Sequence, residues 1–299
     1  MPSTTQQETR INEPGLVGSL FQLTKPRIQV AVILASFCGM VMTLRGMPET
    51  GRMLLIFVIL LLTGSSAAIQ NSLLDMKIDA KMPRTVKRDA AIRHLGEKKL
   101  WTITSIVLIA CIVSAYLFLS AYTAICLFAA SASYVVWYTL FLKRRNPFGA
   151  ILGGIPGALP ILVGSYGVSD RFALDSWLLF WFMMLWQPPH FWALTLKIEE
   201  DYKAAGIPVL PVVYGQEYTE VFIYLYGITL LPVSLMLGHF SGYSLFYLLS
   251  AVVLGVYYLL VTFYTIRVSK NYGLAVKTSL VYLTLLMIVI IVDILTYPL

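Results

Sequence analysis

The chain has 299 residues, of which 58% are hydrophobic and only 12% are charged. Soluble domains carry about 25% charged residues, so this composition excludes a soluble globular protein and indicates an integral membrane protein. The formal net charge of +7 at pH 7 would suit a nucleic-acid-binding protein, but the positions of the cations along the chain argue against that function.

Apolar segments of about 20 residues, the length that a helix needs to cross a bilayer, recur along the whole chain. We predict an all-α integral membrane protein with about nine transmembrane helices around a central cavity. They form one domain, residues 28–299, after a cytoplasmic segment at residues 1–27. Two loops that carry motifs lie near residues 71–99 and 197–220. The predicted spans are residues 28–44, 53–70, 101–119, 122–142, 149–168, 176–196, 221–237, 244–266 and 274–295.

The lysines and arginines are divided unevenly between the two sides of the membrane that these spans define. Of the 22 in the chain, all but Arg45, Arg52 and Arg171 fall on the side of the N-terminus. The positive-inside rule then predicts a cytoplasmic N-terminus and, with an odd number of spans, a C-terminus outside. The leader resembles neither a signal peptide nor a transit peptide. We therefore expect a multi-pass protein of a bacterial inner membrane, with lipid rather than nucleic acid around it.

Several reactive or polar residues receive no functional role. Cys38, Cys111 and Cys126 fall inside predicted spans without the spacing of metal ligands, so we expect small, buried apolar residues. His239 lies at an outer turn and is expected to be inert. Asp293 is close enough to the C-terminal interface that we expect it to reach water.

The most charged stretch of the chain is NSLLDMKIDAKMPRTVKR, residues 71–88. Asn71, Asp75 and Asp79 are four residues apart, so on a helix they form one stripe with steps of about 6 Å. Two carboxylates and an amide oxygen suit Mg²⁺, which proteins hold with one or two carboxylates and substrate phosphate oxygens. The stretch is expected to continue the preceding helix until Pro83. The alternative is a solvated loop whose cations only orient the protein.

Cations near this motif are candidate ligands of a diphosphate. The candidates are Lys25 and Arg27 before the first span, Arg84 and Arg88 after the acids, and Lys143 and Arg144, with Tyr138 beside them, at the end of the fourth span. Anchoring at the lipid headgroups is the favoured explanation of the first pair, whereas topology explains the last pair as well as diphosphate binding does.

The fifth and sixth predicted spans contain residues that are unusual for membrane helices. Glycines and prolines between residues 153 and 160 imply a kink or very close packing, and these residues either shape a pocket wall or serve packing alone. In the sixth span, the sequence QPPH at residues 187–190 interrupts an apolar segment. Polar groups inside a bilayer are candidate functional residues, although a lone histidine such as His190 is often only a packing residue.

A second acidic motif, EEDY at residues 199–202, follows the sixth span just as the first follows the second span. The two motifs are therefore four spans apart and reach the same side of the membrane. This spacing predicts two related four-helix halves that face each other. Asp201 is then expected to face Asp75 and Asp79 across the central cavity.

With both stretches in view, the sequence resembles the UbiA-type intramembrane prenyltransferases and, within them, the protoheme IX farnesyltransferases. The resemblance covers most of the chain. It rests on TKPR at residues 24–27, DMKIDAKMPRT at 75–85, YTLFLKR at 138–144, WQPPHFWAL at 186–194 and DYKAAGIPVLPVVYG at 201–215.

The sequence departs from the family pattern at four positions. Met76 and Lys77 stand where relatives usually carry Arg-Asp, and Asp89 replaces a common proline. Lys197 stands one turn before Asp201, so a second D-x-x-x-D motif is absent. The departures leave open whether a second metal ion binds near Asp201.

The resemblance implies transfer of the farnesyl group of farnesyl diphosphate to a vinyl group of haem b, with Mg²⁺ as cofactor, at a site open to the cytoplasm. It implies Asn71, Asp75, Asp79 and Asp201 as metal ligands, and adds His190 to the three acids as a catalytic group that contacts haem. Haem A synthase or the assembly of a terminal oxidase would be the partner. The implied substrate-binding residues are Lys25, Arg27, Arg84, Arg88, Tyr138, Lys143, Arg144, Trp186, Gln187, Phe191, Tyr202 and Lys203.

Two other functions remain open at this stage. The first is an intramembrane prenyltransferase that acts on a quinone precursor, and the second is a haem-binding or haem-transporting protein without prenyl chemistry. The paired acids argue against a transporter, which has no evident need of them. Among the enzymes, the WQPPHF sequence and the lone Asp201 favour haem as the acceptor.

Overall fold

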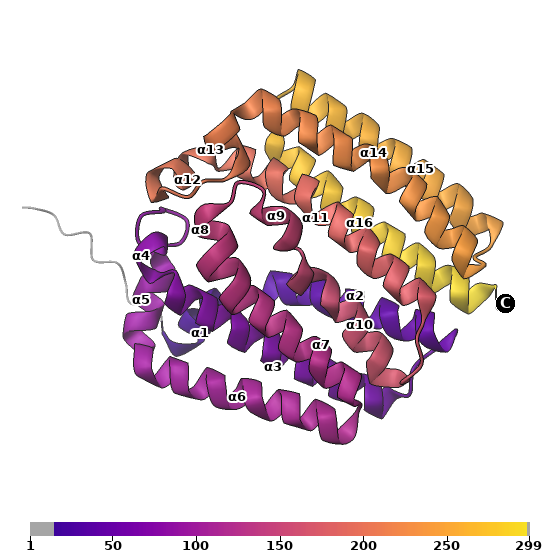
Figure 1. Cartoon of the computed structure of the whole chain (residues 1–299), viewed down its shortest axis with the longest axis horizontal. Coiled ribbons are helices and arrows are strands. Elements are labelled where there is room, and N and C mark those ends of the chain that lie inside the picture. Colours follow the sequence, from indigo (N-terminus) through magenta and orange to yellow (C-terminus); the bar gives the residue numbers. More distant parts are fainter. Residues whose placement is uncertain (1–14, 298–299) are drawn as a thin grey trace, which may run out of the picture.

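The computed structural model describes residues 15–297, so residues 1–14 of the predicted N-terminal segment lie outside the described part. Long helices run side by side, and the described residues contain no strand, as the predicted fold class requires (Figure 1). The helices are α1 (Leu16–Thr24), α2 (Pro26–Leu44), α3 (Thr50–Leu74), α4 (Met76–Asp79), α5 (Val86–Leu95), α6 (Glu97–Phe118), α7 (Ala121–Ala132), η1 (Ser133–Leu142), α8 (Lys143–Arg145), α9 (Gly149–Leu152), α10 (Ile155–Val168), α11 (Leu174–Lys197), α12 (Glu199–Ala205), α13 (Leu210–Tyr214), α14 (Gln216–Ser241), α15 (Leu245–Phe263), η2 (Tyr264–Val268) and α16 (Tyr272–Thr296), of which η1 and η2 are π-helices.

Within residues 15–297, eight helices are long and apolar enough to cross a membrane, and each coincides with a predicted span. The remaining predicted span, the sixth, corresponds to α11, which has 24 residues but carries the polar QPPH sequence and is not among the eight. Because α11 packs along α10, α14 and α16, it also runs through the bundle (Figure 1). Nine long helices therefore run through the bundle within residues 15–297 when α11 is included for its position, whereas length and composition alone identify eight.

The outward faces of the helices are covered by large apolar side chains, which suits contact with lipid rather than water. Ile106, Ile109 and Phe128 are each more than 60% exposed. The three cysteines are buried, as predicted. Asp293, in contrast, does not reach water: it is 1% exposed and accepts hydrogen bonds from the backbone N–H (3.1 Å) and the hydroxyl of Ser244. It thereby places a carboxylate at the start of α15, where the helix dipole stabilises negative charge.

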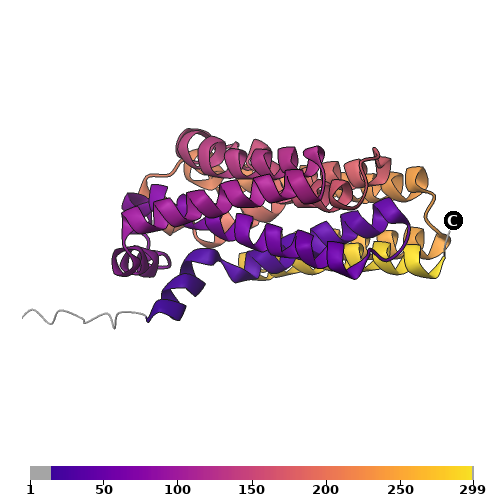
Figure 2. The ribbon, with the colours of Figure 1, turned by 90° about the horizontal axis from the view of Figure 1, so that it is seen from below.

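The short helices gather at one end of the bundle, away from the C-terminus (Figure 1). At this end α4 and α5 follow α3, while α12 and α13 follow α11, in agreement with the expected pair of related halves. Helix α1 packs against α3 and α5 and lies outside the main stack of long helices (Figure 2). The two motif segments are thus brought to the same end of the molecule.

The prediction that the first motif continues the preceding helix as far as Pro83 is wrong. Helix α3 ends at Leu74, and Asp75 has φ −95° and ψ 5° between α3 and α4. The backbone N–H of Asp75 still donates to Asn71 O (3.0 Å), and that of Asp79 donates to Asp75 O (2.7 Å). The three motif side chains therefore keep a helical succession across the break, and α4 ends at Asp79.

Two glycines allow α2 and α10 to approach closely. A Cβ atom on Gly39 of α2 would overlap the carbonyl oxygen of Ile161, and a Cβ on Gly164 of α10 would overlap the carbonyl oxygen of Ser36. Small residues at a helix crossing let the backbones of membrane helices meet. This crossing fixes the position of α10, whose Val163 forms part of a cavity wall.

We predict that Gly39→Ala or Gly164→Ala destabilises the protein by about 1–3 kcal/mol, because the added methyl group forces the two backbones apart. The measurement is thermal unfolding of the purified protein in detergent. Gly227→Ala is the matched control, since its Cβ would meet side chains of Leu259 and Tyr258 only at 3.6 Å, and alanine favours a helix. Equal melting temperatures for Gly39→Ala and Gly227→Ala would contradict the predicted crossing.

Candidate active site

A cavity of about 440 Å³ lies between α2, α3, α7, η1, α10 and α11, beside the motif segments. Its polar and charged lining comes mostly from the end where the short helices gather, and includes Asn71 and Asp79. Its apolar lining continues along the long helices as far as Leu60, Leu127 and Val163. Because Leu60 precedes Asn71 by 11 residues of α3, the lining extends about 16 Å along that helix.

The carboxylate of Asp75 is held by two cations from the segment that follows η1. Lys143 Nζ lies 2.5 Å from Asp75 Oδ2, and Arg144 Nη2 lies 3.3 Å from Asp75 Oδ1. The amide of Asn71 also donates to Asp75 Oδ2 (3.2 Å). Asp75 is only 1% exposed, so its charge requires such partners. The first motif and the YTLFLKR sequence, which are far apart in the chain, therefore meet at one carboxylate.

Asn71 is the centre of a second set of hydrogen bonds. Its Oδ1 accepts from Lys25 Nζ (2.7 Å) and from the hydroxyl of Tyr134 (3.1 Å), while its Nδ2 donates to the hydroxyl of Thr139 (2.9 Å). Lys25 Nζ also donates to the hydroxyl of Tyr134 (2.9 Å). Lys25 therefore points into the site and does not serve only as an anchor at the headgroups.

The π-helix η1 supplies residues that the sequence analysis did not select, chiefly Tyr134. The hydroxyl of Thr139 donates to Tyr134 O (2.8 Å), a contact across five residues. The rings of Tyr134 and Tyr138 are stacked with centroids 6.2 Å apart, and Gly153 leaves the space that the Tyr138 ring fills. π-Helical segments often occur at functional sites, but a tyrosine four residues before another is no signal in an apolar span.

Asp79 lies in the lining of the cavity, and its partners come from the loop and helix that follow it. Arg88 Nη1 is 3.3 Å from Asp79 Oδ2, and the hydroxyl of Thr85 donates to Asp79 O (2.9 Å). Asp79 is 2% exposed, so the ion pair with Arg88 offsets the cost of burying its charge. The local turn between α4 and α5 thus positions both the acid and the cation.

The second motif meets the first through Arg84. Arg84 Nε lies 3.4 Å from Asp201 Oδ2, and its guanidinium lies 5.8 Å from the centroid of the Tyr202 ring. Met82 is buried in an apolar cluster with Tyr202 and residues that follow α12. Burial raises the pKa of Tyr202 above its usual value, so its hydroxyl stays protonated and can donate a hydrogen bond. Asp201 itself is not part of the cavity lining.

The remaining candidate residues divide between the cavity and its surroundings. Gln187 and Phe191 line the cavity. Trp186 and His190 face α16, where His190 Nδ1 is 2.5 Å from the hydroxyl of Ser279. The rings of Trp186 and His190 stack with their centroids 4.7 Å apart. The indole of Trp186 donates to the carbonyl of the same serine (3.1 Å).

Two of the predicted substrate-binding cations lie away from the cavity. Arg27 is exposed at the first turn of α2 and is not part of the lining. Lys203 forms ion pairs of 2.8 and 2.9 Å with two glutamates of α12. These hydrogen bonds raise the pKa of Lys203. Both cations thus lie outside the group that surrounds Asn71, Asp75 and Asp79.

Within residues 15–297, no three His, Cys, Asp or Glu side chains converge as a ready metal site. Asp75 and Asp79 are paired with cations instead. Mg²⁺, however, needs only one or two carboxylates when substrate phosphates supply further oxygens. The oxygens of Asn71, Asp75 and Asp79 therefore fit such an ion when it arrives with phosphate groups, and the same cations suit those phosphates.

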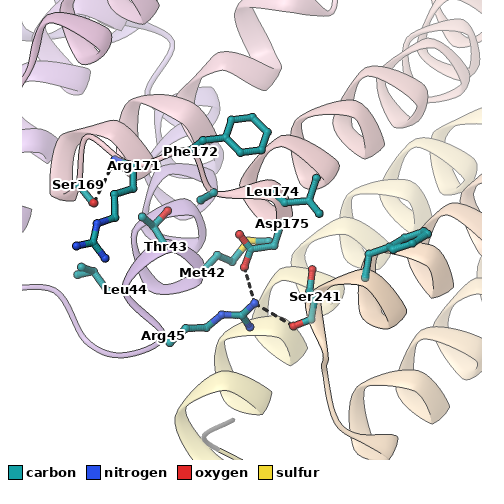
Figure 3. Close-up of a pocket in the computed structure, with 12 residues that line it drawn as sticks. Met42, Thr43, Leu44, Arg45, Ser169, Arg171, Phe172, Leu174, Asp175 and Ser241 are labelled. Carbon is teal, nitrogen blue, oxygen red and sulfur yellow. Dashed lines mark hydrogen bonds and ion pairs between the residues drawn. The ribbon is translucent and has the colours of Figure 1, made fainter.

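A second pocket, of about 450 Å³, lies at the opposite end of the bundle (Figure 3). There Arg45 Nη2 is 3.0 Å from Asp175 Oδ2 and donates to Ser241 O (2.9 Å). These contacts join the ends of α2, α11 and α14 and match the one buried acid with one cation. This pocket contains a single acid and lacks the two motif segments that meet at the first cavity, so we place the candidate active site at the first.

Several proteins of similar sequence carry the same name. A protoheme IX farnesyltransferase of Geotalea uraniireducens is 39% identical over 259 residues, which cover 87% of this chain and 100% of that protein. A protein of the same name from Bordetella avium is 32% identical over 286 residues, covering 94% of this chain and 95% of the relative.

Solved structures share the fold at low sequence identity. A digeranylgeranylglyceryl phosphate synthase superposes with a TM-score of 0.77 at 15% identity, covering 94% of this chain and 99% of the other. A UbiA homologue from Archaeoglobus fulgidus bound to DMAPP and Mg²⁺ superposes with a TM-score of 0.68 at 12% identity, covering 91% and 99%. The model of the UbiA prenyltransferase family matches residues 32–294. On this match and on the sequence relatives, the chain belongs to the UbiA prenyltransferase family, whose fold surrounds the cavity described above.

Proposed function

We propose that the protein transfers the farnesyl group of farnesyl diphosphate to a vinyl group of haem b. The observation that carries this proposal is a rim of paired acids and cations at one end of an apolar cavity of about 440 Å³. An allylic diphosphate has an anionic head and an apolar tail, so it matches both parts. The names of the relatives favour haem b as the acceptor and farnesyl as the donor.

The cations of the rim would bind and orient the diphosphate. Lys143, Arg88, Arg84 and Lys25 all line the cavity, so their charges can stabilise the negative charge that develops when the allylic C–O bond breaks. Arg144 reaches the same site through Asp75 (3.3 Å). Charge-assisted hydrogen bonds to phosphate are stronger than neutral ones, so this set supports diphosphate as the leaving group.

Asn71, Asp75 and Asp79 would hold Mg²⁺, and Asp201 would join them from the second motif. The bound ion would neutralise charge on the departing diphosphate. Solved relatives of the same fold were determined with Mg²⁺ and a prenyl diphosphate, which supports the metal. Arg84 links Asp201 to the segment of the first motif (3.4 Å), so the two motif segments can act on one ligand.

The apolar part of the cavity would hold the prenyl tail and exclude water from the allylic cation. Its depth of about 16 Å along α3 is comparable to an extended chain of three isoprene units. Tyr134, Tyr138 and Phe191 supply aromatic faces in the lining, and aromatic faces attract cations. These features support a prenyl donor over a purely polar substrate.

The names of the sequence relatives favour haem b over a quinone precursor as the acceptor. Trp186 and His190 lie between α11 and α16, so a contact between His190 and haem would occur on that side of α11. We further propose a bacterial inner membrane as the location, with the motif end in the cytoplasm, and haem A synthase or terminal oxidase assembly as the partner.

Incubation of the purified protein with haem b, farnesyl diphosphate and Mg²⁺ should yield a farnesylated haem that mass spectrometry detects in the extract. Removal of divalent ions with a chelator should abolish the product, and added Mg²⁺ should restore it. A parallel reaction contains a quinone precursor in place of haem b. Unchanged haem together with a prenylated quinone precursor would refute the proposed acceptor.

Asp75→Asn and Asp79→Asn should each reduce turnover by at least about 100-fold, because several kcal/mol of charge stabilisation is lost with the metal. The matched control is Asp89→Asn, since Asp89 forms an exposed pair with Arg93 (2.8 Å) on α5. Melting temperatures in detergent establish that each variant is folded. Near-normal rates in either motif variant would show that the metal assignment is wrong.

The proposed orientation predicts which introduced cysteines an impermeant thiol reagent can reach in intact cells. The three native cysteines are buried, so their background is low. Asp170→Cys, in the exposed loop after α10, should react in intact cells, whereas Lys98→Cys, exposed at the start of α6, should react only after the cells are opened. The reverse pattern would place the motif end outside.

A further inference from the structure

The side chain of Gln187 is a fixed amide in the wall of the cavity. It lies on α11, and Phe191 and Leu194 of the same helix also line the cavity. The Gln187 Nε2 group donates to Gly154 O (2.8 Å) and to Met183 O (3.2 Å). A primary amide has two N–H donors, so both are used. These bonds also determine which end of the amide is the oxygen.

The oxygen of this amide has no such partner. Among the described residues, none donates a hydrogen bond to Gln187 Oε1. A Cβ atom on Gly157 would overlap this oxygen, and one on Gly154 would lie 3.1 Å from Nε2. The glycines of α10 and of the turn before it thus leave room for the amide, whose oxygen lies against Gly157.

An amide oxygen that stays without a hydrogen-bond donor in an apolar cavity destabilises the folded protein by about 1–3 kcal/mol. A water molecule is the donor that fits the chemistry of the proposed reaction. We propose that Gln187 is a positioning residue, whose Oε1 holds the water molecule that completes the product. This inference rests on the proposed function, and adds to it the residue that decides how the reaction ends.

The C–O bond of farnesyl diphosphate breaks and its electron pair leaves with the diphosphate. The vinyl group of haem b forms a C–C bond to the farnesyl carbon, which leaves a cation on the vinyl carbon next to the ring. The water at Gln187 adds to this cation and forms a C–O bond. Its surplus proton passes to the released diphosphate, and the product carries a hydroxyl group.

Without a positioned water, the same cation loses a proton and forms an alkene. The two products differ by the mass of one water molecule, so their ratio reports on the water and not on the overall rate. A residue that only supports the fold would lower both products together. The product ratio is therefore a readout that a purely structural role would not move.

The test compares Gln187→Met with Gln187→Glu and with two controls in the haem b and farnesyl diphosphate assay. Methionine keeps the length of the side chain but has no strong acceptor. Glutamic acid, which is neutral in an apolar site, keeps a carbonyl oxygen. Gln29→Met removes another amide of the cavity lining, whose Nε2 donates a single bond of 3.4 Å to Thr24 O and whose buried Oε1 likewise has no partner among the described residues. Gln70→Met removes a buried amide between α3 and α6, outside the lining.

We expect Gln187→Met to lower the ratio of hydroxylated to alkene product at least about tenfold, the effect of one lost hydrogen bond. Gln187→Glu should restore the ratio, and both control variants should retain it. With heavy-oxygen water, the label should enter the hydroxylated product. An unchanged ratio in Gln187→Met, or a loss of hydroxylation in Gln29→Met instead, would overturn the assignment. If the wild-type protein forms no farnesylated haem at all, the proposed function is refuted. This outcome is distinct from an unchanged product ratio, which refutes only the role of Gln187.

Discussion

The site depends on the pairing of buried carboxylates with cations from other segments. Asp75 and Asp79 are 1% and 2% exposed, and a buried charge without a partner costs several kcal/mol. Lys143 reaches Asp75 from the end of η1, and Arg88 reaches Asp79 from α5. The acids can therefore be buried only when these segments meet, so folding of this end of the bundle and assembly of the site are the same event.

The glycines of α10 and of the turn before it link the packing of the bundle to the shape of the cavity. Gly164 faces α2, where it admits the backbone at Ser36, whereas Gly157 faces α11, where it admits the amide of Gln187. One helix therefore uses one residue type for two purposes, close packing on one side and space for a polar group on the other. This double use explains why a fully membrane-embedded helix is so rich in residues that weaken helices in water.

Much of the fold could be predicted from hydropathy, because lipid requires long apolar helices whatever their neighbours. The site was predictable where charge density is unusual, as at Asp75, Asp79 and Lys143. Tyr134 could not be predicted, because its place in the site depends on the π-helical turn of η1 and on a contact with Lys25 (2.9 Å). The end of α3 at Leu74 was also missed, since Pro83 was the only strong helix breaker in that stretch. Contacts between distant segments leave no local signal.

The same pairing suggests how a substrate could enter without leaving charges exposed in a poorly hydrated site. Removal of one partner from a buried ion pair costs about 3–5 kcal/mol, so a diphosphate that took both Lys143 and Arg144 from Asp75 would leave that carboxylate unpaired. A metal ion that took Asp75 alone would leave Lys143 unpaired in the same way. If the two ligands arrived together, the carboxylate would turn to the metal and the lysine to the phosphate, and every charge would keep a partner. The paired state in this structure is therefore consistent with joint binding of Mg²⁺ and the diphosphate.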